Sequence, residues 1–458
     1  MVALFIVLTG IASASYFDGV WKSQGYGYVF EITDKTLKGF EVTTNTCVAG
    51  FTAKEDGSTV PGREASFRTE DGDVYFVRAG DTGDHRRLHS EGSASDMRID
   101  RFPSMPPVCY SLTGDTPQNN FEVFTRTWAE NYISFDLKHA NWEQSVAQSR
   151  TRVTSHTTPV ELFEILKAMI QPFGDMHTFI GAPKLKLQFH GLRPGTDRVV
   201  VDTVGASDFR QFRKSGLPKL WAITDEIYLR DHALRQFCNG QLQYGHVDGA
   251  TGYLRILSFS GYSKAGGFSR GLEALEAALD EIFSDPALRS LVIDVRINFG
   301  GDDPYGLAIA SRLATTDYLA YDKQARADPV DHNKWTPVDP SIVKPSSRPS
   351  FRGPVVELTG PLTISAGETF TQALMGRVPH VIRIGENTQG VFSDVLVRQL
   401  PNGWKFGLPN EIYRTADGLA FDGTGIPPDI SVPVFAGADV AARKDPALMK
   451  AIEFLKKQ

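Results

Sequence analysis

The sequence predicts an α/β core that is preceded by a helical segment and by an N-terminal all-β domain. Residues 16–110 alternate apolar and polar side chains between turn signals, which is typical of antiparallel strands. Residues 121–177 show helical periodicity instead. From residue 249 to residue 435, apolar strands alternate with amphipathic helices, and this pattern indicates a sheet covered on its faces.

The composition excludes some classes of partner. The chain has 458 residues, of which 41% are hydrophobic and 22% charged, and its net charge is −6. This is a globular composition with room for about three ordinary domains. No large basic excess or Lys/Arg run occurs, so we expect no nucleic-acid partner.

The first residues predict export. An apolar run at residues 2–8 precedes Ala-Ser-Ala at residues 12–14, a cleavage pattern before Ser15, although a positive n-region is missing. The run is too short to span a bilayer, and we expect no membrane span elsewhere. We therefore expect residues 1–14 to be a signal peptide and the protein to be periplasmic or extracellular.

The three cysteines are too few for a disulfide scaffold. In an oxidising compartment Cys47 and Cys109 are able to pair, since both lie in the N-terminal region, and Cys238 would then be free. No CxxC, His/Cys cluster or HExxH motif occurs. We therefore expect neither a metal site nor another cofactor.

Turn chemistry supports the expected strands and helices before the core. An alternating run at residues 28–32 precedes an Asp-Lys turn, and Asp-Gly at residues 71–72 separates two further strand-like runs. The turn-rich stretch Ser111–Asn120 is expected to be a linker. A helix is expected to begin after Thr158, where Thr-Pro-Val-Glu is a capping box with proline at the first helical position.

Residues 182–248 are expected to form an insert of unknown type. They contain a strand-like run at residues 199–204 and a helix-like run at residues 226–237. A peptide-binding domain has this place in related architectures, but no carboxylate-binding loop of the Gly-Leu-Gly-Phe kind occurs here.

The core elements are expected in a fixed order: strand 253–259, helix 269–283, strand 291–295, helix 305–314, strand 355–359, a helix that begins after Ser365, and strand 380–384. The carboxyl ends of the strands in such a sheet carry the loops that face a ligand. Ser365 follows one of these strands and precedes a helix. Backbone N–H groups and the helix dipole favour a developing oxyanion at that point.

Each candidate has a plain structural explanation when it is taken alone. Ser365 is then a helix N-cap, since serine is a preferred capping residue. Gly300-Gly301 is a tight strand-to-helix turn, and His177 is one histidine of ten. The run Gly407–Val432, with its Asp-Gly and Gly-Ile-Pro-Pro-Asp turns, is a hairpin that carries no function.

Taken together, these pieces resemble the C-terminal processing or tail-specific serine proteases, including their tricorn-like and retinoid-binding-protein-like branches. The matching stretches are GDMHT (Gly174–Thr178), LVIDVRINFGG (Leu291–Gly301), TISAGE (Thr363–Glu368), GENTQG (Gly385–Gly390) and DGTGIPPDI (Asp422–Ile430). The resemblance implies a crotonase-like α/β core with Ser365 as the nucleophile. It also implies an oxyanion hole made by the N–H groups of Ala366 and the Gly300-Gly301 turn.

One departure from the family pattern bears on the general base. The bacterial branch has a lysine directly after the glycine of its GExTxGK run, whereas Val391 stands here. The branch without that lysine uses a histidine before the core, and His177 has this position. In the family an acid orients the imidazole: Asp422 matches the family's acidic residue and Asp175 is the local candidate, while Met176 stands where the tricorn pattern has a serine. Glu368 and Glu411 are expected to be structural.

The leading interpretation is an exported serine peptidase that acts on polypeptides. A histidine base predicts activity that rises as His177 deprotonates. One alternative is a non-catalytic module that binds a hydrophobic ligand on the same fold. Another is a crotonase-type acyl-CoA enzyme, against which the export signal and the lack of a basic phosphate clamp argue. Together, Ser365, His177 and the glycine turn favour the peptidase. The sequence predicts no oligomeric state.

Overall fold

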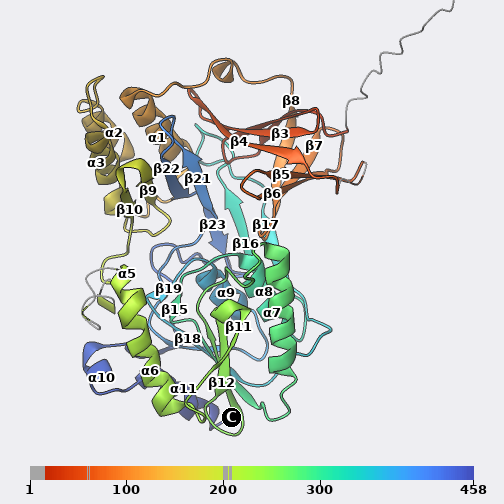
Figure 1. Cartoon of the computed structure of the whole chain (residues 1–458), viewed down its shortest axis with the longest axis vertical. Helices are drawn as coiled ribbons and strands as arrows, with labels where there is room; N and C mark the ends of the chain where they lie inside the picture. The colour runs from red at the N-terminus through yellow and green to blue at the C-terminus, as the bar shows by residue number, and fades with distance from the viewer. Residues whose placement is uncertain (1–15, 59, 61, 197, 200–204, 206–208) are drawn as a thin grey trace, which may run out of the picture. The chain divides into compact units, whose positions relative to one another are not determined.

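The computed structural model describes residues 16–58, 60, 62–196, 198–199, 205 and 209–458. The described chain divides into two compact units, the first up to Glu91 together with Asp96–Thr113, the second Gly92–Ser95 and Gly114–Gln458. The predicted signal peptide, and most of the strand-like run at 199–204, lie outside the described residues. Figure 1 labels the elements.

The first unit is a closed barrel of eight antiparallel strands, so the predicted all-β region is present. Its strands are β1 (Gly19–Ser23), β2 (Tyr28–Thr33), β3 (Thr36–Val42), β4 (Cys47–Glu55), β5 (Glu64–Thr69), β6 (Val74–Ala79), β7 (His85–Ser90) and β8 (Met97–Phe102). The barrel closes because β8 pairs with β1. Trp21, Phe30 and Phe67 are among the side chains that fill it.

Both predicted hairpins of this region are confirmed. Asp34 and Lys35 lie between β2 and β3 with φ values of 48° and 62°, the conformation that a two-residue hairpin turn requires. Gly72, with φ 98°, lies between β5 and β6.

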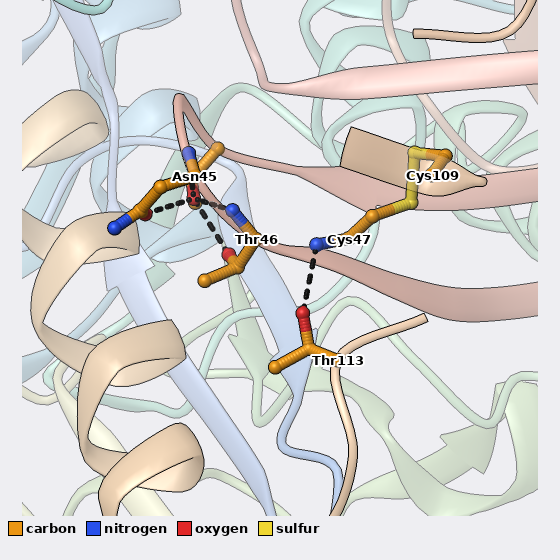
Figure 2. The surroundings of a disulfide bond; sticks show 6 residues. Asn45, Thr46, Cys47, Cys109 and Thr113 are labelled. Atoms are coloured by element: carbon orange, nitrogen blue, oxygen red, sulfur yellow. Dashed lines mark hydrogen bonds between the residues drawn. A yellow bond between two sulfur atoms is a disulfide. The ribbon is translucent and has the colours of Figure 1, made fainter. Parts of the chain in front are cut away.

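The disulfide between Cys47 and Cys109 confirms the predicted pairing, and Cys238 is free and buried. Figure 2 shows that the bond joins the start of β4 to the segment that follows the barrel. Beside it, the Cys47 N–H donates a hydrogen bond to the Thr113 hydroxyl at 3.1 Å. The covalent bond and the hydrogen bond thus tie this segment to one strand.

The second unit begins with three helices and a small antiparallel sheet. The helices are α1 (Pro117–Asn131), α2 (Trp142–Arg150) and α3 (Pro159–Ile170), and the strands, in sheet order, are β10 (Leu187–His190), β9 (Phe179–Ala182), β22 (Lys405–Pro409) and β21 (Val395–Gln399). The predicted capping box of α3 is present, since Thr158 and Glu161 exchange hydrogen bonds. The helices pack on β22 through Phe124 and Phe406, whose ring centroids lie 5.0 Å apart.

The predicted linker at residues 111–120 extends past the start of α1. Its last four residues form the first turn of α1 because the Thr116 hydroxyl accepts the Asn119 N–H and Pro117 occupies the first helical position.

The predicted α/β core is present, and its sheet has seven strands. Its strands, in sheet order, are β11 (Arg235–Phe237), β12 (Leu242–His246), β13 (Thr251–Ile256), β14 (Ser290–Asp294), β18 (Val355–Thr359), β20 (Ile382–Gly385) and β24 (Ile430–Ser431). The five strands from β13 onward run parallel. Alternate residues of these strands face opposite sides, so both faces are buried.

Helices cover the two faces (Figure 1). On one face lie α7 (Phe268–Phe283), α8 (Asp303–Leu313) and α9 (Ala366–Met375), and on the other lies α11 (Pro446–Leu455). The remaining elements are α5 (Phe209–Gln211), α6 (Leu217–Tyr228), α10 (Gly437–Ala441), the parallel pair β15 (Ile297–Asn298) and β19 (Leu362–Thr363), and a sheet of β17 (Asp339–Val343), β16 (Tyr318–Ala325) and β23 (Glu411–Arg414). No helix in the described ranges has the length and apolarity that a membrane crossing requires.

The prediction of a helix at residues 226–237 is wrong. Helix α6 ends at Tyr228, and the chain turns at His232, whose φ is 52°. Residues 235–237 then form the edge strand β11 beside β12, so this end of the expected insert belongs to the core sheet. Pairing with a distant strand overrides the local helical pattern here.

Candidate active site

Ser365 lies where the chain passes from β19 into α9, at the carboxyl end of the central strands. It is the N-cap residue of α9, but its φ of 56° and ψ of −122° are not the extended values of an ordinary N-cap. A residue with a side chain rarely adopts such a positive φ, and backbone strain of this kind is concentrated at functional sites. Capping alone therefore does not explain this conformation.

The predicted glycine turn lies directly against this serine. A Cβ atom on Gly300 would lie 2.6 Å from the Ser365 Cβ and 3.1 Å from its hydroxyl oxygen, so only glycine permits the approach. The Gly300 N–H, however, donates to the Asn298 side-chain oxygen at 2.9 Å. The prediction that Gly300 donates to the oxyanion is therefore wrong, because its N–H already donates to Asn298. Gly300 instead allows the turn to lie close to Ser365.

The other two predicted donors have free N–H groups. Gly301 is exposed, and no hydrogen-bond partner for its N–H is found in the described part of the chain. Ala366 is the first residue of α9, where helix geometry leaves the N–H without an intrahelical partner. An oxyanion next to Ser365 would find these two groups and the positive end of the helix dipole.

Ser365 and Gly301 line one cavity of about 140 Å³. The other lining residues come from α8, α9, β23, the start of β21 and the segment that leads into it: Asp303, Thr369, Phe392, Ser393, Asp394, Val395 and Tyr413. The cavity therefore joins the candidate nucleophile and a candidate oxyanion donor to several polar groups that the sequence did not single out.

His177 lies on the loop before β9 and is buried, with 6% of its surface exposed. Its Nδ1 atom lies 3.1 Å from the Phe392 carbonyl oxygen. Because a carbonyl only accepts hydrogen bonds, Nδ1 carries the proton in this contact, and Nε2 of the neutral ring keeps its lone pair. Burial lowers the pKa of His177 below its usual value, so the ring is neutral near pH 7.

The structure does not join His177 directly to Ser365 or to a carboxylate through its ring. Asp175 accepts the His177 backbone N–H at 2.7 Å, rather than a ring proton. Burial, with the Asp175 charge as a second cause, raises the pKa of Asp422 to about 8, and one of its oxygens has no partner within the described residues. The Phe392 carbonyl occupies the orienting position, so an acid in that role stays a prediction.

Glu368 was expected to be structural, and it holds the site together. It is fully buried, and its carboxylate accepts four hydrogen bonds. One oxygen accepts the Thr388 hydroxyl and the Gly390 N–H, each at 2.6 Å, and the other accepts the Val391 N–H at 2.7 Å and the Ser365 N–H at 3.3 Å. The Ser-x-x-Glu pattern of a capping box was the available sequence signal.

Comparison with known proteins identifies the core. Residues 250–432 match Peptidase family S41. The chain carries a domain of this family. This domain is a serine-type peptidase domain, and a polypeptide is the substrate that the family implies. No curated protein sequence matches the chain.

Solved structures share the fold. A candidate peptidase from Parabacteroides merdae is 24% identical, with a TM-score of 0.59 over 75% of this chain and 97% of the other. Mature CPAF complexed with lactacystin is 12% identical, with a TM-score of 0.51 over 75% of this chain and 97% of the other.

Proposed function

We propose that the protein is an exported serine peptidase in which Ser365 is the nucleophile and His177 the general base. The observation that carries the proposal is the backbone of Ser365, which holds its side chain at the start of α9 against the Gly300 turn. The family match and the mostly parallel sheet also support a crotonase-like core.

The chemistry follows from the protonation state of the imidazole. A serine hydroxyl is a poor nucleophile until a neutral base removes its proton, and His177 has a lowered pKa and a free Nε2 lone pair. The tetrahedral oxyanion then binds the N–H groups of Gly301 and Ala366. Loss of one such donor costs about 10²–10³ in rate.

Labelling with a fluorophosphonate tests the two roles. We expect the wild type to be modified on Ser365, and we expect no modification of Ser365→Ala or His177→Ala, with the modified peptide located by mass spectrometry. His190→Ala is the matched control, since His190 is another histidine with a lowered pKa, but its side chain is exposed and stacks on Phe179. Unchanged labelling of His177→Ala would reject the base, and no labelling of the folded wild type would reject the peptidase.

Export is supported by the disulfide between Cys47 and Cys109, because such bonds persist in oxidising compartments. Mass spectrometry of the intact chain recovered from the periplasm or the medium tests whether the protein is exported. We expect a mature chain that begins at Ser15, and a full-length chain in the cytoplasm would contradict the proposal.

The hydrophobic-ligand module is the weaker alternative. The cavity beside Ser365 is lined by the carboxyl groups of Asp303 and Asp394. Burial of an apolar ligand against these groups would remove their solvation without a compensating hydrogen bond.

A further inference from the structure

The cavity next to Ser365 contains two acidic side chains that the catalytic proposal does not use. Asp303 is the first residue of α8, and Asp394 immediately precedes β21. The Asp394 side chain is 51% exposed, so a group that enters the cavity reaches its carboxylate. Ser365 and Gly301 form part of the same wall. A substrate carbonyl at these two residues therefore places its neighbouring side chain beside the acids.

The two acids of the cavity have different partners. The Lys323 ammonium lies 2.5 Å from an Asp394 oxygen and 3.1 Å from a Glu411 oxygen. Asp303 instead accepts hydrogen bonds from two neutral hydroxyls, those of Thr369 at 2.7 Å and Tyr321 at 2.9 Å. Asp394 is thus paired with a cation, whereas the described hydrogen bonds of Asp303 come from neutral groups.

Asp303 therefore lies in surroundings that are poor in positive charge. Burial, followed by the charge of Asp394, raises the pKa of Asp303 to about 7. A further cation between the two acids would relieve this repulsion and favour the ionised form of Asp303. Because the cavity adjoins Ser365, the cation that a polypeptide substrate would bring to it is a basic side chain.

The size of the cavity selects among organic cations. Its volume is about 140 Å³. An engineered cavity of about 150 Å³ accommodates benzene, which has six non-hydrogen atoms. A lysine side chain has five such atoms, and an arginine side chain has seven. A lysine side chain therefore matches this volume more closely than an arginine side chain does.

We propose that this cavity is the subsite for a lysine side chain at the substrate residue whose carbonyl Ser365 attacks, with Asp303 and Asp394 as its carboxylate partners. The inference rests on the proposed function, since it places the scissile carbonyl at Ser365 and Gly301. It makes polypeptides with accessible lysines the preferred substrates.

Peptidyl phosphonates that differ only in the residue next to phosphorus test the subsite. We compare the second-order labelling rates of the lysine, arginine and leucine compounds on the full-length protein. We expect the lysine compound to react about tenfold faster than the leucine compound or more, the factor that one charge-assisted hydrogen bond supplies. We expect it also to exceed the arginine compound. A lysine rate at or below either of the others would overturn the proposal.

Two variants assign the preference to the carboxylates. Asp394→Asn and Asp303→Asn are each expected to reduce the lysine-to-leucine ratio about tenfold. Asp303→Asn does not alter the ion pairs of Lys323 with Asp394 and Glu411. It therefore tests the proposal even if Asp394→Asn does not fold. Asp231→Asn, at an exposed acid paired with Arg230, is the control for loss of one negative charge. An unchanged ratio in both cavity variants would also overturn the proposal.

A fluorophosphonate without an amino-acid side chain separates this inference from the proposed function. If it labels Ser365 while lysine gives no advantage, the subsite is wrong and the peptidase stands. If it does not label Ser365, both proposals fail.

Discussion

At the scale of single residues, Glu368 connects the nucleophile to the group that orients the base. Its carboxylate accepts the N–H groups of Ser365 and Val391, and the residue after Val391 is Phe392, whose carbonyl holds the His177 ring. All four of its partners donate to it, and this favours the ionised carboxylate, because a proton would occupy one of its acceptor sites. Burial raises its pKa to about 7.

Glu368→Gln should therefore lower kcat and leave KM nearly unchanged. An amide offers one acceptor oxygen and turns an NH₂ group toward donors, so we expect kcat to fall about 10–100-fold. In the wild type, activity should be present above pH 7 and be lost as the pH falls through 7, because protonation removes an acceptor. In the variant, this loss of activity near pH 7 should disappear. Activity should then fall only below pH 6.5, where His177 becomes protonated. An identical pH profile would reject the role of Glu368.

At the scale of elements, the turn between β15 and α8 is built to approach the start of α9. Gly300 has a φ of 77°, and a methyl group there would meet Ser365. We expect Gly300→Ala to reduce fluorophosphonate labelling about 100-fold, because a displacement of about 1 Å in a catalytic group costs that much.

Gly418 provides the matched control for this substitution. Its φ is also 77°, but a Cβ there would have no neighbour within 4 Å. Both alanine variants carry the same backbone strain, of about 1–3 kcal/mol, whereas only one displaces the serine. Equal labelling rates in the two variants would show that strain, and not contact with Ser365, is responsible.

The elements that the sequence predicted well are those specified by local patterns. Strand β18 and helix α7 follow from apolar runs and periodicity, and α3 follows from its capping box. Strand β11 was missed because only its pairing with β12 makes it extended. An edge strand of three residues has too few positions to show a period.

The same distinction holds within the candidate site. Ser365 and His177 each lie in a short motif, so the sequence identified them. Asp303, Lys323 and Asp394 come from three separate elements, and only the fold brings them together. The Phe392 carbonyl could not be predicted at all, because every residue has a carbonyl and its direction depends on the fold.

At the scale of the whole molecule, buried carboxyl groups should make stability fall as the pH rises from about 4 to about 8. Burial raises the pKa of Glu357 on β18 to about 8, and one of its oxygens has no partner among the residues that the structure describes. Burial likewise raises the pKa of Asp422 to about 8 and the pKa values of Asp303 and Glu368 to about 7. Between the unfolded pKa, near 4, and these values, the native state binds more protons than the unfolded state. Stability therefore decreases as the pH increases through this window.

Glu357→Gln should remove part of this dependence. Histidines with lowered pKa values, such as His177, are present in both proteins, so their effect on stability cancels when the two are compared at the same pH. We expect the variant to exceed the wild type in free energy of unfolding at pH 8.5 by an amount on the order of a few kcal/mol, and by much less at pH 5.5. Urea denaturation at both pH values measures this difference. Glu453→Gln, at an exposed helical position, should leave the wild-type dependence unchanged. A Glu357→Gln advantage that is the same at both pH values would mean that packing, and not ionisation of this buried group, sets the effect.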